Sequence, residues 1–342
     1  MIGVGLVGTG YWGINLCRSL AQNRDVRLTW LCDQNPAALA RASKFAPAAQ
    51  TSSDLDRVLE DQSLDAVVLA TPAATHAPLG LRALAANKHL LVEKPLAMTT
   101  RDAEGMCREA ERRQLILMVG HTYLYNPAVR RIKEMLEAGE LGDIRYASCQ
   151  RLNLGIVRSD VDALWNLAPH DLSMLEYWLG HHVTGVAAVG HAYLQAGVAD
   201  VAFAHLWYEG GASGHIHVSW LDPAKARRAT VVGSKRMLIF DDMSADMRLM
   251  VFDKGIDAET SDQPMGGYNS FAEHRFLVRA GDAWMPRVDG TEPLALEVAA
   301  FVDSIKTGRR PLADGRHGAA IVKTLERISG AMMMTPPRAA RE

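Results

Sequence analysis

A glycine-rich turn near the start of the chain constrains the fold more than any other feature. Gly8, Gly10 and Gly13 follow an apolar run that reads as a buried strand, and helical spacing of apolar residues resumes after them. In such a unit of strand, turn and helix, the glycines allow a tight turn, a close approach of the backbone to a pyrophosphate and close helix packing. The sequence therefore predicts a dinucleotide site here, with Tyr11 and Trp12 of the turn as part of it.

An acidic residue at the end of the next predicted strand supports this interpretation. Asp33 lies twenty positions beyond Gly13. A carboxylate at that place accepts hydrogen bonds from both ribose hydroxyls and repels a 2'-phosphate, so NAD is favoured over NADP as the cofactor. The alternative is that Asp33 caps a helix that begins at Pro36.

Composition and charge narrow the class of protein. The chain has 342 residues, of which 48% are apolar, and a net charge of −2. It can therefore bury two sizeable cores, and nothing in its charge indicates a nucleic-acid partner. No apolar run approaches the roughly twenty residues that cross a bilayer. We expect a cytoplasmic protein without a membrane partner.

Metal-binding patterns are weak in this sequence. The four cysteines are scattered without a C-x-x-C pair, which favours reduced, buried thiols and predicts no zinc site. His215 and His217 alternate on a predicted strand and so share a face. A single H-x-H pattern without a carboxylate or cysteine cluster more often packs across strands than holds a metal. We therefore predict no metal centre.

Strand and helix signals alternate through the first third of the chain. Near-continuous apolar strands between helices predict a parallel, doubly wound sheet that is covered on both faces. The predicted elements are strands at 66–70, 90–93 and 115–119 and helices at about 77–86 and 100–113.

Two segments at the carboxyl ends of these strands are expected to line the cofactor cleft, because open parallel sheets bind ligands at that edge. Their residues are Thr71, Pro72, Thr75, His76, Glu93 and Lys94. Thr75 is equally suited to cap the following helix. Lys94 stands at the end of a strand, before Pro95. It therefore points toward the place where a nicotinamide would lie, although a surface lysine paired with Glu93 is the alternative.

The pattern changes after Asn126 and Pro127, and a second domain begins near there. We divide the chain into a dinucleotide-binding domain at 1–122 and a second domain at 123–342, which is expected to bind substrate and to form oligomers. Successive strands joined by short turns predict a mainly antiparallel sheet in this α+β domain. The predicted strands are 144–152, 183–193, 199–208, 214–220, 229–232 and 237–240, and two helices, 294–307 and 315–332, follow. His181 and His182 read as a turn, and the methionines at 332–334 as the end of an apolar helix face.

Several motifs together resemble the Gfo/Idh/MocA oxidoreductase family over nearly the whole chain. They are the turn at 8–13, the segment 70–72, Glu93-Lys94-Pro95, Gly120-His121, Asn126-Pro127-Ala128-Val129 and Gly139-Glu140-Leu141-Gly142. The closing part of the chain, from Glu292-Pro293-Leu294 through Glu297 and Phe301 to Asp314-Gly315, is also similar to the family. The resemblance implies a Rossmann domain followed by an open-faced sheet domain that often mediates homodimers or homotetramers.

The resemblance also implies catalytic roles. Lys94 matches the family lysine that polarises the substrate hydroxyl or ketone beside the nicotinamide. His170 matches the histidine of a helical Asp-x-x-x-His pair, and an imidazole is a suitable base for the hydroxyl proton. Asn166 departs from the pattern, because the family usually carries aspartate at this position and an amide cannot stabilise an imidazolium as a carboxylate does. The alternative to a catalytic role is that His170 is a structural residue near the start of a helix, after Pro169.

Substrate recognition is expected from His121 and from polar residues of the second domain, above all Arg151 and Asn153. The basic run 225–228 is either an anion-binding segment or a solvated loop. The sequences of segments 164–172 and 219–223 are similar to those of enzymes that oxidise nucleotide-linked amino sugars. The favoured function is an NAD-dependent sugar or nucleotide-sugar dehydrogenase. An inositol-type cyclitol dehydrogenase and a weakly catalytic NAD-binding regulator are the alternatives.

Overall fold

A computed structural model of the chain describes residues 1–180, 183–258 and 276–335. It divides into two compact units. The first comprises residues 1–127, 164–174 and 290–332, and the second comprises 128–163, 175–289 and 333–342. The first unit thus takes in two segments that lie beyond the sequence-based division at residue 122. Among the described residues, no helix is both long enough and apolar enough to span a bilayer.

The first unit is built on a parallel sheet of six strands in the order β3-β2-β1-β4-β5-β6. The fully buried side chains of Leu6, Leu31, Leu69 and Leu91, one from each of four strands, form the centre of its core. The strands are β1 (Ile2–Val7), β2 (Val26–Cys32), β3 (Gln50–Ser52), β4 (Ala66–Leu69), β5 (His89–Glu93) and β6 (Leu117–Gly120). The predicted doubly wound α/β domain is confirmed.

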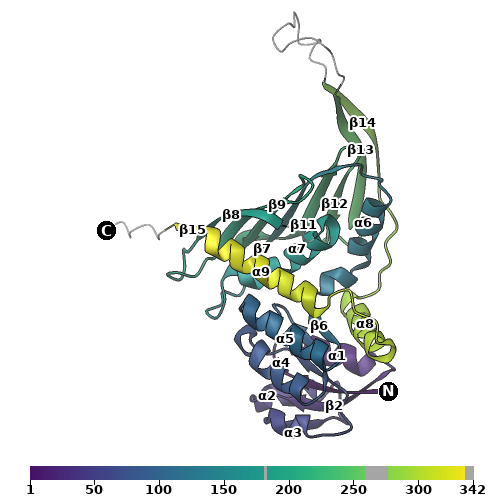
Figure 1. Cartoon of the computed structure of the whole chain (residues 1–342). Coiled ribbons are helices and arrows are strands. Elements are labelled where there is room, and N and C mark those ends of the chain that lie inside the picture. Colours follow the sequence, from purple (N-terminus) through teal and green to yellow (C-terminus); the bar gives the residue numbers. More distant parts are fainter. Residues whose placement is uncertain (181–182, 259–275, 336–342) are drawn as a thin grey trace, which may run out of the picture. The chain divides into compact units, whose positions relative to one another are not determined.

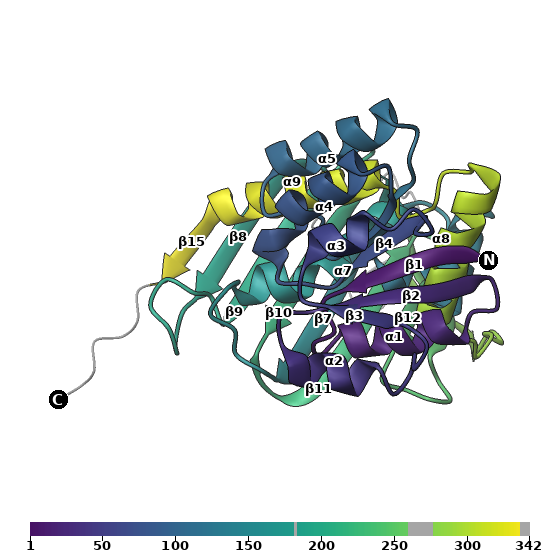
Figure 2. The same ribbon diagram turned by 90° about the horizontal axis from the view of Figure 1, so that it is seen from below.

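Helices cover both faces of this sheet. Helices α1 and α2 lie on one face and α4 and α5 on the other, as right-handed crossovers require (Figure 2). Further along the chain, α8 packs against α1 and α9 packs against α5. The helices of the first unit are α1 (Gly13–Gln22), α2 (Pro36–Ala42), α3 (Leu55–Leu59), α4 (His76–Ala85), α5 (Thr100–Arg112), α8 (Pro293–Thr307) and α9 (Gly315–Ala331), with the short 3-10 helices η1 (Ala73–Thr75) and η2 (Thr122–Tyr125).

The second unit contains a nine-stranded sheet in the order β14-β13-β12-β11-β7-β10-β9-β8-β15 (Figure 1). Strands β7 and β10 pair in parallel at its centre, and the neighbouring pairs are antiparallel. The predicted open-faced, mainly antiparallel sheet is therefore confirmed. The strands are β7 (Ile144–Leu154), β8 (Val183–His191), β9 (Val201–Tyr208), β10 (Ser213–Ser219), β11 (Leu221–Gly233), β12 (Met237–Asp241), β13 (Leu249–Ala258), β14 (Phe276–Trp284) and β15 (Met332–Thr335). Helix α6 (Pro127–Glu137) and part of α7 (Ala163–Leu179) belong to this unit.

Two local expectations in the second unit are wrong. The basic run 225–228 is not a loop but part of β11, because its backbone pairs with β7 in antiparallel register. The methionines at 332–334 do not continue a helix, because α9 ends at Ala331 and the chain enters β15, where Met333 is 70% exposed. His181 and His182 lie outside the described residues.

The histidines of β10 pack as the sequence predicted. The ring of His217 stacks on Phe203 with centroids 4.2 Å apart, and His215 lies 6.3 Å from His205 on the neighbouring strand. Burial lowers the pKa of both His215 and His217, so the neutral imidazole is favoured at these positions.

Candidate functional site

The glycine-rich turn has the geometry that its spacing predicted. Gly8 has φ +90°, which favours glycine, and its N–H donates to the carbonyl of Cys32 at 2.8 Å. A Cβ at Gly13 would lie 2.0 Å from the carbonyl oxygen of Gly8, so this position tolerates only glycine. A Cβ at Gly10, in contrast, would meet no atom within 4 Å. Gly8 and Gly13 therefore build the turn, whereas the space above Gly10 is open to a ligand.

The start of α1 suits an anionic ligand. Its N-cap, Trp12, makes no side-chain capping bond, and the first turn holds no acidic residue. The helix amides and the positive end of the helix dipole are therefore available to phosphate groups. The turn and the open space above Gly10 fit the pyrophosphate of a dinucleotide.

These observations predict that Gly10→Ala will mainly weaken NAD binding, whereas Gly13→Ala will mainly lower stability. Gly10→Ala should leave the melting temperature within about 2 °C, because the new methyl group meets nothing, and should weaken NAD binding at least tenfold by occupying the ligand's space. Gly13→Ala should lower the melting temperature by several degrees, because its methyl group collides with the Gly8 carbonyl. Thermal melts and calorimetric titration with NAD measure both effects. Equal NAD affinity in Gly10→Ala and wild type would contradict the assignment of the turn.

Asp33 stands at the end of β2, beside this turn. Its Oδ2 accepts hydrogen bonds from the Thr9 N–H at 2.6 Å and from the Thr9 hydroxyl at 3.0 Å. The alternative capping role falls to another residue, because Asn35 is the N-cap of α2 and accepts from Ala37 N–H at 3.0 Å. Asp33 is thus held by Thr9 of the glycine-rich turn through Oδ2 and by the backbone N–H of Asn35 through Oδ1 at 2.8 Å, and its contact with a ribose stays a prediction.

The segment after β4 is held by its own side chains. Thr75 does not cap α4 with its side chain, and its hydroxyl lies 2.7 Å from the Thr71 hydroxyl. The ring nitrogens of His76 lie 2.7 Å from the carbonyl oxygen of Pro95 and 2.8 Å from that of Thr71. His76 is only 1% exposed. His76 therefore joins the segment at Thr71 to the segment at Pro95 through buried contacts. A direct contact of its ring with a cofactor stays a prediction.

Lys94 follows the last residue of β5 and precedes a cis peptide bond to Pro95. Its Nζ donates to the main-chain carbonyl of Asn166 at 2.7 Å. The side chain therefore reaches helix α7, and the alternative of a lysine paired only with Glu93 at the surface is not what the structure shows. The Glu93 carboxylate instead accepts from the indole N–H of Trp12 at 2.5 Å.

Helix α7 presents the second group of predicted residues. Asn166 and His170 are four positions apart and so lie on one helical face. Pro169 lies inside this helix and has no N–H, so it makes no helical hydrogen bond to the carbonyl four residues before it. Trp165 anchors the same turn, because its indole N–H donates to the Ser329 hydroxyl of α9 at 2.9 Å. The structure thus brings Lys94 to the turn of α7 that carries Asn166, one turn before His170.

His170 is half-buried, and its ring lies 5.2 Å from the ring of Tyr123. The next residue, Asp171, is only 1% exposed and so points to a different side of α7. Tyr123 was not among the predicted site residues, because an aromatic residue in a 3-10 helix has no sequence signal that separates a site from a core position.

His121 lies deep in the first unit rather than at a surface. It is 1% exposed, neither ring nitrogen has a hydrogen-bond partner, and its ring meets that of His317 edge-on at 5.3 Å. Burial, with the nearby His317 and Lys94, lowers its pKa well below the usual range, so the ring is neutral. Its predicted contact with substrate stays a prediction.

The predicted substrate residues of the second unit lie on β7. Arg151 is 5% exposed and Asn153 is half-buried, and both fall on the face of β7 that also carries Cys149. Arg227 of β11 lies directly opposite Arg151 in the register and forms an ion pair with Asp242 at 3.7 Å. Arg227 was mentioned only as part of the basic run, because the pairing of β11 with β7 is not visible in the sequence.

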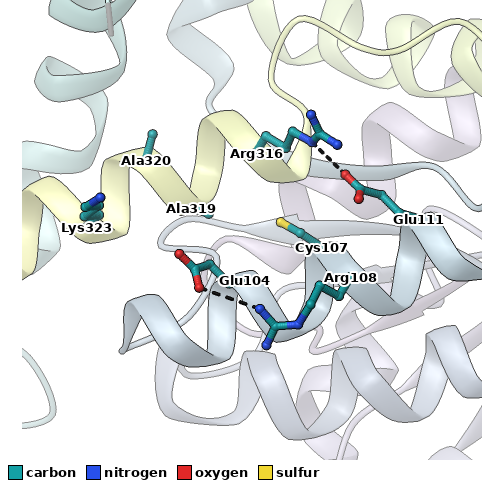
Figure 3. Close-up of a pocket in the computed structure, with 8 residues that line it drawn as sticks. All are labelled: Glu104, Cys107, Arg108, Glu111, Arg316, Ala319, Ala320 and Lys323. Carbon is teal, nitrogen blue, oxygen red and sulfur yellow. Dashed lines mark hydrogen bonds and ion pairs between the residues drawn. The ribbon is translucent and has the colours of Figure 1, made fainter. Parts of the chain in front are cut away.

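A groove between α5 and α9 contains none of the predicted site residues. Cys107 lies in it, between the ion pairs Glu104–Arg108 and Glu111–Arg316 (Figure 3). Burial raises the pKa of the Cys107 thiol to about 11, so the thiol stays protonated and unreactive near neutral pH. The charges of the groove largely neutralise one another.

Comparison with protein families identifies the chain. Residues 2–121 match the oxidoreductase family with an NAD-binding Rossmann fold, and residues 129–239 match the GFO/IDH/MocA C-terminal domain. The chain belongs to the Gfo/Idh/MocA family. The resemblance that the motifs indicated is thereby confirmed, and the chain is an oxidoreductase with an NAD-binding Rossmann domain.

Individual members of the Gfo/Idh/MocA family match different lengths of the chain. Myo-inositol 2-dehydrogenase of Thermotoga maritima is 25% identical over 326 residues, which are 92% of this chain and 91% of that protein. 4-Carboxy-2-hydroxymuconate-6-semialdehyde dehydrogenase of a Sphingobium species is 30% identical over 204 residues, 57% of this chain and 65% of that protein. Among solved structures, UDP-N-acetylglucosamine 3-dehydrogenase GnnA from Acidithiobacillus ferrooxidans has a TM-score of 0.80 at 25% identity, covering 97% of this chain and 98% of that chain.

Proposed function

We propose that the protein is an NAD-dependent dehydrogenase that transfers a hydride between the nicotinamide and a secondary alcohol or ketone on the ring of a sugar or nucleotide sugar. The observation that carries this proposal is the 2.7 Å contact of Lys94 with the carbonyl of Asn166. It joins the strand end of the dinucleotide-binding sheet to the helix turn that precedes His170. A cation and an imidazole on adjoining elements are the groups that acid-base chemistry on a hydroxyl needs.

The chemistry divides between the two side chains. A bound nicotinamide accepts the hydride in the oxidative direction and donates it in the reverse direction. Lys94 donates a hydrogen bond to the substrate oxygen and stabilises the negative charge that develops there when the proton leaves. His170 takes up that proton as a general base and returns it in the reverse direction. When substrate binds, its oxygen replaces the Asn166 carbonyl as an acceptor for one of the three ammonium protons.

NAD is the proposed cofactor because of Asp33. Its carboxylate is fixed by Thr9 at the end of β2, close to the turn that fits a pyrophosphate. A negative charge there opposes a 2'-phosphate, which disfavours NADP. A preference of at least tenfold for NAD in kcat/KM supports the assignment, and a preference for NADP counts against it.

The choice of a nucleotide sugar rests on the whole-chain match to the solved structure of UDP-N-acetylglucosamine 3-dehydrogenase. A relative of that name is also 31% identical over 179 residues. A cyclitol is the second candidate, because a relative that covers 92% of this chain is a myo-inositol 2-dehydrogenase. Both are alcohols on six-membered rings, so the reacting groups named above serve either.

A substrate panel separates these candidates. We would follow NAD reduction at 340 nm with UDP-linked amino sugars, free sugars, uronic acids and inositols at equal concentrations. The proposal expects kcat/KM for a nucleotide sugar to exceed that for myo-inositol by at least a hundredfold. The reverse ranking would establish the cyclitol reading instead, and Lys94→Ala serves as the blank in both cases.

Asn166 offers a test of how its amide affects the reaction. Lys94 contacts the main-chain carbonyl of Asn166, so Asn166→Asp changes the side chain without removing that contact. We expect the carboxylate to stabilise an imidazolium at His170 and to raise kcat about fivefold to thirtyfold, the usual range for one added charge interaction of about 1 to 2 kcal/mol. Asn166→Leu is the matched control, with kcat no higher than that of wild type. Steady-state kinetics at pH 7 decides, and a fall in kcat for Asn166→Asp would show that the amide itself contacts the substrate.

A further inference from the structure

One hydrogen bond joins the glycine-rich turn to the strand end that carries the lysine. The indole N–H of Trp12, the N-cap of α1, donates to Oε1 of Glu93 at 2.5 Å, although the two residues are 81 positions apart. Glu93 is the last residue of β5 and the neighbour of Lys94. The turn and Lys94 are therefore connected through one carboxylate.

The Glu93 carboxylate is held on two further sides. The backbone N–H of Lys94 donates to Oε2 at 3.2 Å. Gly120 at the end of β6 leaves room for the carboxyl group, because a Cβ at that position would lie 3.0 to 3.1 Å from its carbon and both oxygens. The side chain of Glu93 is thus packed between β6, the lysine and Trp12, and the indole of Trp12 donates to it from a side chain.

The carboxyl group of Glu297 interacts electrostatically with that of Glu93. Glu297 of α8 is 0% exposed, and burial together with the charge of Glu93 raises its pKa well above the usual range, despite an opposing contact with Thr122. Glu297 is therefore the protonated member of the pair. Burial raises the pKa of Glu93 to about 7, whereas Lys94 and the indole of Trp12 lower it. His121 and His76, which both interact with the charge of Lys94, have pKa values lowered mainly by burial, so both rings favour the neutral form.

We propose that Trp12 is a positioning residue for the reaction, which holds Glu93 as a carboxylate at a fixed place beside Lys94 and so ties the glycine-rich turn to the lysine. The inference rests on the proposed function of the same site. In this arrangement the contact weakens when Glu93 takes up a proton, because a neutral carboxylic acid is a poorer acceptor than a carboxylate. Activity that depends on the placement of Lys94 is therefore present above neutral pH and falls as the pH drops through about 7.

The substitution Trp12→Phe tests this role, because it keeps an aromatic ring and removes the donor. We expect kcat/KM at pH 7.5 to fall about tenfold to a hundredfold, the usual effect of losing a hydrogen bond to a charged group. The fall should lie mainly in kcat. Without the indole, the pKa of Glu93 rises further, so the acid limb of the pH profile should move to higher pH.

A matched control exists in the same unit. The indole N–H of Trp30 donates to Oδ2 of Asp61 at 2.7 Å, also joining a tryptophan to a carboxylate, but neither residue belongs to the site. Trp30→Phe should leave kcat/KM within about twofold and the acid limb in place. If both variants lose activity to the same extent with unmoved profiles, Trp12 acts only through stability and the inference is overturned.

A spectroscopic readout does not depend on activity. The chain has seven tryptophans, and the indole resonance of Trp12 in a ¹⁵N-labelled sample is the one that Trp12→Phe removes. We expect this resonance to shift with a midpoint near pH 7 in wild type and to stop titrating in Glu93→Gln. If Trp12→Phe does not fold, the resonance of Trp12 can be assigned from Glu93→Gln. It is the indole resonance that shifts with pH in wild type and no longer shifts in that variant.

Different outcomes would exclude the positioning role of Trp12 and the dehydrogenase activity. A non-titrating indole in an active enzyme would overturn the inference and leave the dehydrogenase in place. A titrating indole in a protein that reduces no NAD with any substrate would overturn the dehydrogenase, and with it the catalytic role of the contact.

Discussion

Lys94→Ala should lower kcat by about 10² to 10⁴, the usual contribution of one acid-base group. The ammonium lies 2.7 Å from the Asn166 carbonyl on the helix that carries His170, so its removal takes a cation from the reacting region. NAD affinity should change less than about threefold, because the turn and Asp33 carry the cofactor contacts in our assignment. Steady-state kinetics and calorimetric titration with NAD measure the two effects separately.

Lys323→Ala is the control for Lys94→Ala. Lys323 is exposed on α9 and outside the site, so its removal should leave kcat and NAD affinity unchanged. A Lys94→Ala enzyme that turns over at the wild-type rate would remove the lysine from the mechanism. A loss of NAD binding equal to the loss of kcat would make Lys94 a cofactor contact rather than an acid-base group.

His170→Asn should cost a similar factor, about 10² to 10⁴ in kcat, because asparagine cannot take up the hydroxyl proton. The substitution keeps a polar side chain on α7, where His170 is half-buried against Tyr123. Added imidazole should restore part of the activity. The rate of the variant should also rise with pH, since hydroxide replaces the missing base.

His317→Asn is the comparison for His170→Asn. His317 is a histidine of α9 that is 7% exposed and packs against His121. Its substitution should affect stability more than kcat and should give no rescue by imidazole. If His170→Asn kept more than about a third of the wild-type kcat, the base would have to be sought elsewhere.

The sequence predicted those parts of the site that depend on local backbone geometry. Gly8 and Gly13 are required by a positive φ and by a 2.0 Å approach, and such requirements leave a fixed spacing in the sequence. The doubly wound sheet was predictable for the same reason, because strands buried on both faces read as continuous apolar runs. The place of Lys94 at a strand end also followed from this alternation.

Contacts between distant segments left no such signal. Lys94 meets the main-chain carbonyl of Asn166, and a carbonyl is present at every position, so no residue type indicates the pairing. The hydrogen bond from Trp12 to Glu93 spans 81 positions and depends on where the glycine-rich turn and the end of β5 lie in the folded sheet. Glu297 appeared in the sequence only as part of a family pattern, and its complete burial results from the packing of α8 against α1 and η2.

Polar composition misled the interpretation of the second unit. A solvated loop was one of the two alternatives for the basic run at 225–228, but β11 forms because its backbone pairs with β7 on one side and β12 on the other. Strand formation depends on neighbouring strands more than on local preference. For Asp33 the structure excludes only the alternative of a helix cap, because Asn35, two positions later, takes that role.

The most direct test of the central claim is to follow a deuterium atom from substrate to cofactor. We would incubate wild type with NAD and the preferred substrate of the panel, deuterated at the ring carbon that bears the reacting hydroxyl, and analyse the cofactor by mass spectrometry. The account predicts NADH that carries one deuterium, formed more slowly than with unlabelled substrate and absent with Lys94→Ala. Bound NAD that gains no deuterium from any member of the panel would contradict the account and would favour a regulatory NAD-binding protein.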